Sequence, residues 1–177
     1  MAPQDSRDHL TYLVTLGLDA NSFMQLQSWR ERYLPPTRNI VPPHITLFHK
    51  LTPSETIPDL LRTTARRFGK IKIRFAELER FSRGFCIRVE SPLLARLRGI
   101  LARELYPTLT AQDRIPFRPH VTLLNKTSRA EAEAALVRLQ AEWTPWDGKG
   151  TGLLLFRYCG GPWEPVAEYP FKPSRKK

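Results

Sequence analysis

An eight-residue segment occurs twice in the chain in nearly the same form, and this repetition constrains the fold more than any other feature. Residues 43–50 read PHITLFHK and residues 119–126 read PHVTLLNK, so the second copy follows the first by 76 positions. Five of the eight positions are identical, and two of the other three exchange one apolar residue for another. We interpret the chain as an internal duplication, whose halves pack about a pseudo-two-fold axis and bring the two segments together.

The hydrophobic patterns around each copy predict the same order of elements: strand, helix, motif strand, helix, strand. The expected strands cover residues 9–18, 44–50, 70–79, 85–90, 120–126, 150–158 and 166–171, and the expected helices cover residues 19–32, 58–68, 91–106 and 128–143. We expect one bilobal α+β domain over residues 1–172, with two antiparallel sheets flanking a central cleft and the helices on the outside. A basic tail over residues 173–177 follows.

Composition limits the class of partner and the cellular setting. The chain has 28 Lys and Arg against 17 Asp and Glu, a net charge of +11, which favours anionic partners. The longest apolar run, around residues 153–156, is far shorter than the ~18 to 20 residues of a membrane span, so no membrane association is expected. Two cysteines and a polar N-terminus without an apolar segment predict a reduced, cytoplasmic protein, by default a monomer.

The repeated segment places chemically matched residues on one face of each strand. Side chains at positions i and i+2 of a strand point to the same side, so His44 lies with Thr46 and His120 lies with Thr122. Two imidazoles with ordinary pKa values of ~6.5 can divide general acid and general base work near neutral pH. Hydroxyl groups beside them can donate hydrogen bonds to phosphate oxygens. The pattern therefore favours phosphodiester chemistry.

Two copies of His-hydrophobic-Thr-hydrophobic in a basic chain of this size resemble the two-histidine (2H) phosphoesterase superfamily, in particular its 2′-5′ RNA ligase and cyclic phosphodiesterase branch. The resemblance implies a bilobal α+β fold and cleavage of 2′,3′-cyclic phosphates of RNA or nucleotides to 2′-phosphates, without a metal or cofactor. Many members also join or cleave 2′-5′ RNA linkages reversibly. It implies that His44 and His120 are the acid and base pair, and that Thr46 and Thr122 bind the phosphate.

One position departs from the pattern of this family. Relatives often have an arginine directly after the second motif, where this chain has Asn125 and then Lys126. If the motif strands run straight, Lys126 and its repeat mate Lys50 lie on the motif-bearing face. We therefore name both lysines as candidate substitutes for the phosphate-binding arginine.

Further candidates surround the motifs. Phe48 is a candidate for stacking on a base, and Phe117 and Arg118, just before the second motif, are candidates for the substrate rim. His49 alternates to the side of its strand opposite His44, and His9 has no repeat mate. We expect these last two histidines to be structural or exposed.

Two other classes of protein share some of these features. A metal hydrolase would use His44, His49 and His120, but no carboxylate or cysteine stands at a metal-binding spacing from them. A non-catalytic RNA-binding module of the same fold would explain the charge but not the matched imidazoles. Sequence alone leaves open which histidine is the acid. It also leaves open whether the substrate is a tRNA fragment, a cyclic nucleotide, an ADP-ribose derivative or a 2′-5′ oligonucleotide.

Overall fold

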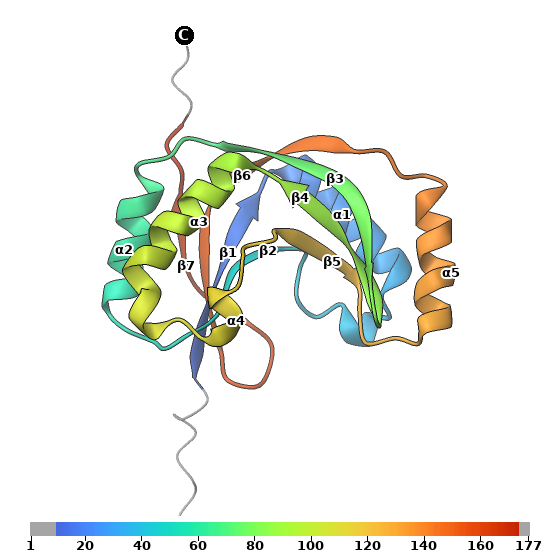
Figure 1. Cartoon of the computed structure of the whole chain (residues 1–177), viewed down its shortest axis with the longest axis horizontal. Helices are drawn as coiled ribbons and strands as arrows, with labels where there is room; N and C mark the ends of the chain where they lie inside the picture. The colour runs from blue at the N-terminus through green and yellow to red at the C-terminus, as the bar shows by residue number, and fades with distance from the viewer. Residues whose placement is uncertain (1–9, 174–177) are drawn as a thin grey trace, which may run out of the picture.

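The computed structural model describes residues 10–173 and shows a mixed α/β architecture (Figure 1). The predicted order of strands and helices is confirmed, and a short helix, α4, is added within the segment expected to be irregular. The elements are β1 (Thr11–Leu18), α1 (Ala20–Tyr33), β2 (Ile45–Leu51), α2 (Thr56–Ala65), β3 (Ile71–Phe81), β4 (Gly84–Glu90), α3 (Pro92–Leu105), α4 (Ala111–Arg114), β5 (His120–Leu124), α5 (Arg129–Gln140), β6 (Trp146–Tyr158) and β7 (Glu164–Pro170), with 3-10 turns η2 (Pro36–Arg38) and η3 (Tyr106–Thr108). His9 and residues 174–177 of the predicted tail lie outside the described residues.

The strands form one antiparallel sheet of seven strands in the order β2-β1-β6-β3-β4-β5, with β7 also paired to β6. The expectation of two antiparallel sheets is not fully confirmed, because the long strand β6 pairs with strands of both halves and joins them in one hydrogen-bonded sheet. It pairs with β1 through residues 150–158 and with β3 through residues 146–150. The expected repeat mates are β1 and β4, β2 and β5, and β3 and β6. Each strand stands as far from one end of the strand order as its mate stands from the other end, as expected for two duplicated halves.

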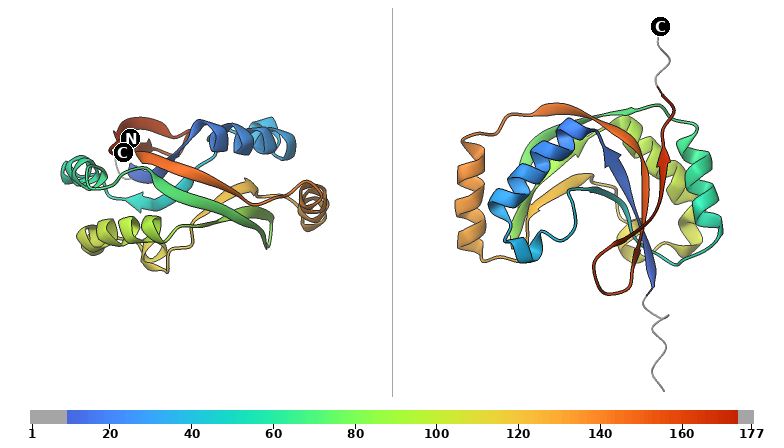
Figure 2. Two further views of the ribbon diagram at one scale, coloured as in Figure 1. Left: turned by 90° about the horizontal axis from the view of Figure 1, so that it is seen from above. Right: turned by 180° about the vertical axis from the view of Figure 1, so that it is seen from behind.

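The sheet bends so that its two ends approach one another. β2 and β5 stand at opposite ends of the strand order, yet they contact each other. Helices α2 and α3 pack together at one end of the molecule, α5 lies at the other end, and α1 crosses behind the motif strands (Figures 1 and 2). The two strands that carry the repeated segment are therefore neighbours in space although they are not hydrogen-bonded partners.

Local signals in the sequence explain where three helices begin. The Asp19 side chain accepts a hydrogen bond from the Ser22 N–H at the start of α1, and Ser91 caps α3 in the same way. Ser128 and Glu131 form a reciprocal capping box at the start of α5. These caps satisfy N–H groups that the first turn of a helix cannot pair internally.

The hydrophobic core lies between the sheet and the helices. Large side chains that are fully buried come from β1, β2, β3 and β4: Leu16, Ile45, Leu47, Phe48, Ile71, Ile73, Phe75, Phe85 and Ile87. At the edge of this core, β4 begins so close to the end of β5 that a Cβ on Gly84 would lie 1.9 Å from the Leu124 carbonyl oxygen. Within residues 10–173, no helix is both long and apolar enough to cross a membrane.

Candidate active site

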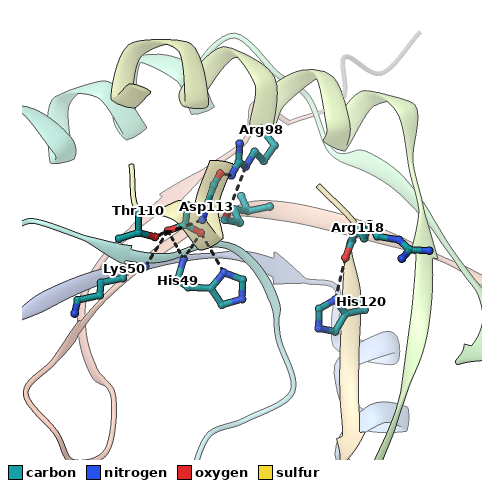
Figure 3. A network of polar contacts seen from close by, with 8 residues as sticks. His49, Lys50, Arg98, Thr110, Asp113, Arg118 and His120 are labelled. Atoms are coloured by element: carbon teal, nitrogen blue, oxygen red, sulfur yellow. Dashed lines mark hydrogen bonds and ion pairs between the residues drawn. The ribbon is translucent and has the colours of Figure 1, made fainter. Parts of the chain in front are cut away.

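The two motif histidines are held in the same way by their own chain. Nδ1 of His44 lies 2.7 Å from the Pro42 carbonyl oxygen. Nδ1 of His120 lies 2.9 Å from the Arg118 carbonyl oxygen (Figure 3). A carbonyl oxygen only accepts hydrogen bonds, so each Nδ1 must carry the proton. This arrangement fixes the orientation of each ring and leaves Nε2 of both histidines for chemistry.

The surroundings of the two rings differ. His44 is half-buried and its ring packs against Trp163, from the β6–β7 loop, with 4.6 Å between ring centroids, whereas His120 is exposed. Burial, reinforced by the positive charges of Arg30 and His120, lowers the pKa of His44 to about 4, although the bond to Pro42 opposes the shift. His44 is therefore neutral at physiological pH and can accept a proton at Nε2.

Arg30 of α1 connects the two motif strands. Its buried guanidinium donates to the Thr122 carbonyl oxygen of β5 at 2.9 Å and to the Val41 carbonyl oxygen, just before β2, at 2.6 Å. It also donates to the Asn39 side-chain oxygen at 3.1 Å. A guanidinium can serve several acceptors at once because its five donors spread in one plane. Arg30 thereby fixes the loop that leads to His44 relative to the strand that carries His120.

Arg98 of α3 makes the corresponding connection from the other half. It donates through Nε to the Leu47 carbonyl oxygen of β2 at 3.2 Å, and through Nη2 to the Asp113 carbonyl oxygen of α4. Its guanidinium also lies 4.2 Å from the centre of the Phe48 ring. Each of the two buried arginines thus holds the motif strand of the opposite half, which keeps β2 and β5 in a fixed relation.

A cavity of about 380 Å³ extends from His120 and Thr46 towards α4. Arg118 and Phe117, both predicted at the substrate rim, are among its lining residues. His44 and Thr122 are not among the residues that line this cavity. The structure therefore brings Thr46, His120 and the two rim residues to one cavity that begins at the motif strands.

Phe48, His49 and Lys50 do not lie where strict alternation places them. The pairing of β2 with β1 is irregular at two points, between Thr46 and Phe48 and between Phe48 and Leu51, and each irregularity adds one residue to β2. One added residue reverses which face the following side chains occupy. The prediction that His49 lies on the side opposite the motif is wrong, because His49 lines the same cavity as Thr46.

The same irregularity removes two other candidates. Phe48 is fully buried beneath Arg98, so the prediction that it stacks on a base is wrong: it has no ring face accessible to a ligand. Lys50 is exposed, does not line the cavity, and extends away from His120 in Figure 3. The expectation that Lys50 lies on the motif-bearing face fails because β2 does not run straight.

Lys126, the other lysine candidate, follows the end of β5 rather than continuing it. β5 ends at Leu124, and Lys126 adopts a positive φ of 54°, which turns the chain towards α5. Its side chain is exposed and is not part of the cavity lining. The premise that the motif strand runs straight to Lys126 therefore fails, and its part in phosphate binding stays a prediction.

Asp113 of α4 is a site residue that sequence reasoning missed. Its carboxylate, only 1% exposed, accepts hydrogen bonds from the backbone N–H of His49 at 2.9 and 3.1 Å, from the backbone N–H of Lys50 at 3.1 Å, and from His49 Nδ1 at 3.1 Å (Figure 3). Burial by itself would raise the pKa of Asp113, but these donors lower the pKa below its ordinary value. Asp113 is therefore ionised and accepts from backbone N–H groups at the outer edge of β2, which stands at one end of the strand order.

The other acidic and sulfur-containing side chains offer few metal ligands. Within residues 10–173, no group of three or more His, Cys, Asp or Glu residues is placed to hold a metal ion. Cys86 and Cys159 are both unpaired. Cys86 is buried at the cavity wall, and burial raises the pKa of its thiol to about 11, so it is protonated and inert at physiological pH.

Comparison with known proteins agrees with this geometry. The family model of the 2′-5′ RNA ligase superfamily matches residues 18–162, which include both motifs. The chain belongs to the 2′-5′ RNA ligase superfamily. No protein with curated annotation matches it.

Solved structures of the superfamily's fold are similar over nearly the whole chain. TT0787 of Thermus thermophilus has a TM-score of 0.63 at 19% identity, over 93% of this chain and 100% of that one. Escherichia coli LigT complexed with 3′-AMP has a TM-score of 0.61 at 20% identity, over 92% and 98%. LigT complexed with NADP+ has a TM-score of 0.58 at 20% identity, over 92% and 97%. At these identities the likeness establishes the fold.

Proposed function

We propose that this protein is a cyclic phosphodiesterase that hydrolyses 2′,3′-cyclic phosphate ends of RNA or nucleotides to 2′-phosphates. The observation that supports this most strongly is the matched presentation of two imidazoles. Both Nδ1 atoms are engaged by the carbonyl of the residue two positions earlier, and both Nε2 atoms remain available. A threonine hydroxyl stands two positions after each histidine, on strands that contact one another.

The reaction needs one proton acceptor and one proton donor. His44 is the acceptor, because its burial beneath Trp163 keeps Nε2 unprotonated at physiological pH. It takes a proton from water as the water oxygen forms a bond to phosphorus. His120, which is exposed, donates its Nε2 proton to the 3′ oxygen as the bond from phosphorus to that oxygen breaks. One proton enters and one leaves, and the phosphate stays on the 2′ oxygen.

The remaining groups stabilise charge on the phosphate. Thr46 and Thr122 donate hydrogen bonds to the two non-bridging oxygens, where negative charge increases in the transition state. The net charge of +11 raises the local concentration of anionic substrate. The same geometry serves 2′-5′ ligation when the 5′ hydroxyl of a second RNA end replaces water, since His44 then deprotonates that hydroxyl instead.

Structural relatives support a nucleotide substrate. LigT has been crystallised with 3′-AMP, NADP+, ATP and phosphate. All four ligands contain phosphate and three of them contain an adenosine unit, which agrees with a site that recognises a phosphate and an attached nucleoside. Two imidazoles and two hydroxyls supply the proton transfers and the charge stabilisation, so we propose that the reaction needs no cofactor.

Variants of the two histidines test this proposal. His44→Ala and His120→Ala are each expected to lower kcat for a nucleoside 2′,3′-cyclic phosphate by about 10² to 10⁴-fold, the usual contribution of a positioned acid or base. The double variant should lose little more than either single one, because both groups act in one step. Thermal unfolding of each variant controls for misfolding. Single variants that keep more than about a tenth of the activity would refute the assignment. A wild type that binds RNA without cleaving it would favour the non-catalytic alternative.

A further inference from the structure

The cavity beside the motif strands contains a carboxylate that the proposed reaction does not use. Glu79 of β3 lines the cavity together with His120, and its side chain is half-buried. Within the described part of the chain, no hydrogen bond or ion pair engages Glu79, because Arg88 of the same cavity pairs with Glu77 instead, at 3.1 Å. An ionised carboxylate only accepts hydrogen bonds, so both oxygens of Glu79 are available to donors of a ligand.

The register of the sheet places Glu79 relative to the phosphate site. Thr122, Cys86 and Glu79 stand in one row across three strands, since Cys86 of β4 pairs with Thr122 of β5 on one side and with Glu79 of β3 on the other. Residues paired in this way direct their side chains to the same face. Neighbouring strands lie ~4.8 Å apart, so Glu79 stands about 10 Å across the sheet from Thr122. This separation suits a nucleoside, which carries the phosphate on its ribose and the hydrogen-bonding edge of its base at the far end.

Aromatic side chains in the same cavity suit the flat faces of a base. Phe81 stands two residues after Glu79 on the same face of β3, lines the cavity and is 39% exposed. Phe117, from the segment before β5, lines the cavity as well. Proteins that read unpaired RNA bases stack them on aromatic rings and form hydrogen bonds with their Watson–Crick edges. The volume of about 380 Å³ lies within the ~300 to 1,000 Å³ of small-ligand sites.

The two halves of the sheet differ at this position, although their motifs match. In the first half, Thr46 and Leu154 both pair with Thr15 of β1, so Leu154 has the place in its row that Glu79 has in the second half. A leucine side chain has no polar atom. A nucleoside extends from only one side of the phosphate, so its recognition requires groups in one half alone. The unmatched carboxylate therefore places the base in the second half.

A carboxylate discriminates among the four RNA bases. Guanine presents two adjacent donors on its Watson–Crick edge, N1–H and the 2-amino group, and these match the two oxygens of a carboxylate. Adenine and cytosine have a ring nitrogen acceptor beside their amino group, and uracil has a carbonyl on each side of its N–H. An acceptor that faces a carboxylate is repelled and left without a donor, which weakens binding.

We propose that Glu79 binds the Watson–Crick edge of guanine and makes the enzyme selective for guanosine 2′,3′-cyclic phosphate ends. This rests on the proposed function for the identity of the phosphate. The ribose lies over Cys86, in the middle of the row, and Phe81 and Phe117 provide apolar surface for the base. Glu79 accepts one hydrogen bond from N1–H and one from the 2-amino group.

The test uses two ligands that differ in one amino group: guanosine 2′-monophosphate and inosine 2′-monophosphate, which lacks the 2-amino group. In calorimetry, the wild type is expected to bind the guanosine ligand at least about tenfold more tightly, as one hydrogen bond to a charged group provides. Glu79→Gln keeps the size of the side chain but replaces one acceptor with a donor. Its preference should fall to about twofold or less. Its affinity for adenosine 2′-monophosphate should rise relative to the guanosine ligand, because an amide matches the donor and the acceptor of adenine.

Glu77→Gln is the matched control. It removes the same charge from the same strand, at an exposed position that does not line the cavity. It should keep the preference for guanosine, although release of Arg88 can change both affinities together. An equal loss of preference in Glu77→Gln and Glu79→Gln would show a diffuse charge effect and would refute the guanine subsite.

Binding needs no turnover, so this inference and the proposed function can fail separately. If the wild type hydrolyses no cyclic phosphate but prefers the guanosine ligand through Glu79, the proposed function fails and the guanine subsite stands. If the wild type hydrolyses cyclic phosphates but shows no preference for guanosine over inosine, the subsite is refuted and the proposed function stands. That comparison is made on the wild type, so it does not depend on how well a variant folds.

Discussion

The contact between His44 and Trp163 makes the pH dependence of catalysis a sensitive test of the site. The ring centroids lie 4.6 Å apart, and Trp163 in turn packs against Phe156 at 5.6 Å, which keeps it over His44. Burial is the largest cause of the fall in the pKa of His44 from 6.5 to about 4. Trp163→Ala admits water to the ring, and we expect the pKa to recover by about two units, since desolvation disfavours the charged form.

The shift has a large effect at mildly acidic pH. A histidine with a pKa of about 4 is about 90% neutral at pH 5, whereas one with a pKa of about 6 is about 10% neutral. If His44 is the general base, the wild type should keep most of its pH 7 value of kcat/KM at pH 5. Trp163→Ala should keep about a tenth of its own pH 7 value. Trp163→Phe, which keeps an aromatic ring over His44, should resemble the wild type.

The assay is kcat/KM for a nucleoside 2′,3′-cyclic phosphate between pH 4 and 8, because this parameter reports the ionisation of the free enzyme. Each variant is compared with its own value at pH 7, so that a lost contact between Trp163 and the substrate does not affect the result. A fall in kcat/KM below about pH 6.5 in the wild type would refute the claim that burial lowers the pKa of His44. The same acid limb in the wild type and Trp163→Ala would refute the part assigned to Trp163.

Three further predictions concern the framework and the charge. Arg30→Lys keeps the positive charge on a single donor nitrogen but loses the fork that serves Thr122 and Val41. We expect the free energy of unfolding to fall by about 2 kcal/mol in urea titration, and kcat to fall as well. Unchanged values of both would contradict the connection between the motif strands. Gly84→Ala places a Cβ 1.9 Å from the Leu124 carbonyl oxygen and should cost about 2 kcal/mol by the same titration, while Gly99→Ala, in open space on α3, should not destabilise the protein. Raising NaCl from 0.05 to 0.5 M is expected to lower kcat/KM severalfold with little change in kcat, because salt screens the attraction of the substrate; a kcat/KM that is insensitive to salt would show that the net charge does not aid capture.

Local signals account for the parts of the fold that the sequence predicted well. The cap at Asp19, the Ser91-Pro92 start and the Ser128 capping box each act within four residues, and the structure contains all three. The four motif residues were proposed as site residues because the chain contains two copies to compare. None of these inferences required knowing which segments meet in space.

The parts that sequence reasoning missed depend on distant contacts. The Asp113 carboxylate is 64 positions from the His49 N–H that it accepts, and Arg30 is 92 positions from the Thr122 carbonyl. The added residues in β2 can be recognised only from its pairing with β1. Simple alternation along β2 therefore placed Phe48, His49 and Lys50 on the wrong faces. The sequence did contain one signal of these contacts. Arg30 and Arg98 lie within the apolar stripes of α1 and α3, and a buried guanidinium needs hydrogen-bond partners from elsewhere in the chain.

The joining of two sheets into one was hidden for a related reason. β6 begins at Trp146, four positions before the predicted start, in a segment with two glycines that disfavour strands. Gly148 is needed there, since a Cβ would lie 2.3 Å from the Ser22 hydroxyl and 2.9 Å from the Phe75 ring. The close approach of α1, β3 and β6 therefore requires a glycine at this position, although glycine by itself disfavours a strand.

The most direct test of the central claim is ³¹P NMR of the product formed from a nucleoside 2′,3′-cyclic phosphate in the presence of EDTA. Acid and base catalysis by His44 and His120 predicts complete conversion to the 2′-phosphate alone, at the same rate with and without the chelator. A 3′-phosphate product would contradict the proposed departure of the 3′ oxygen. Loss of activity with EDTA that zinc, magnesium or manganese restores would contradict the metal-independent mechanism.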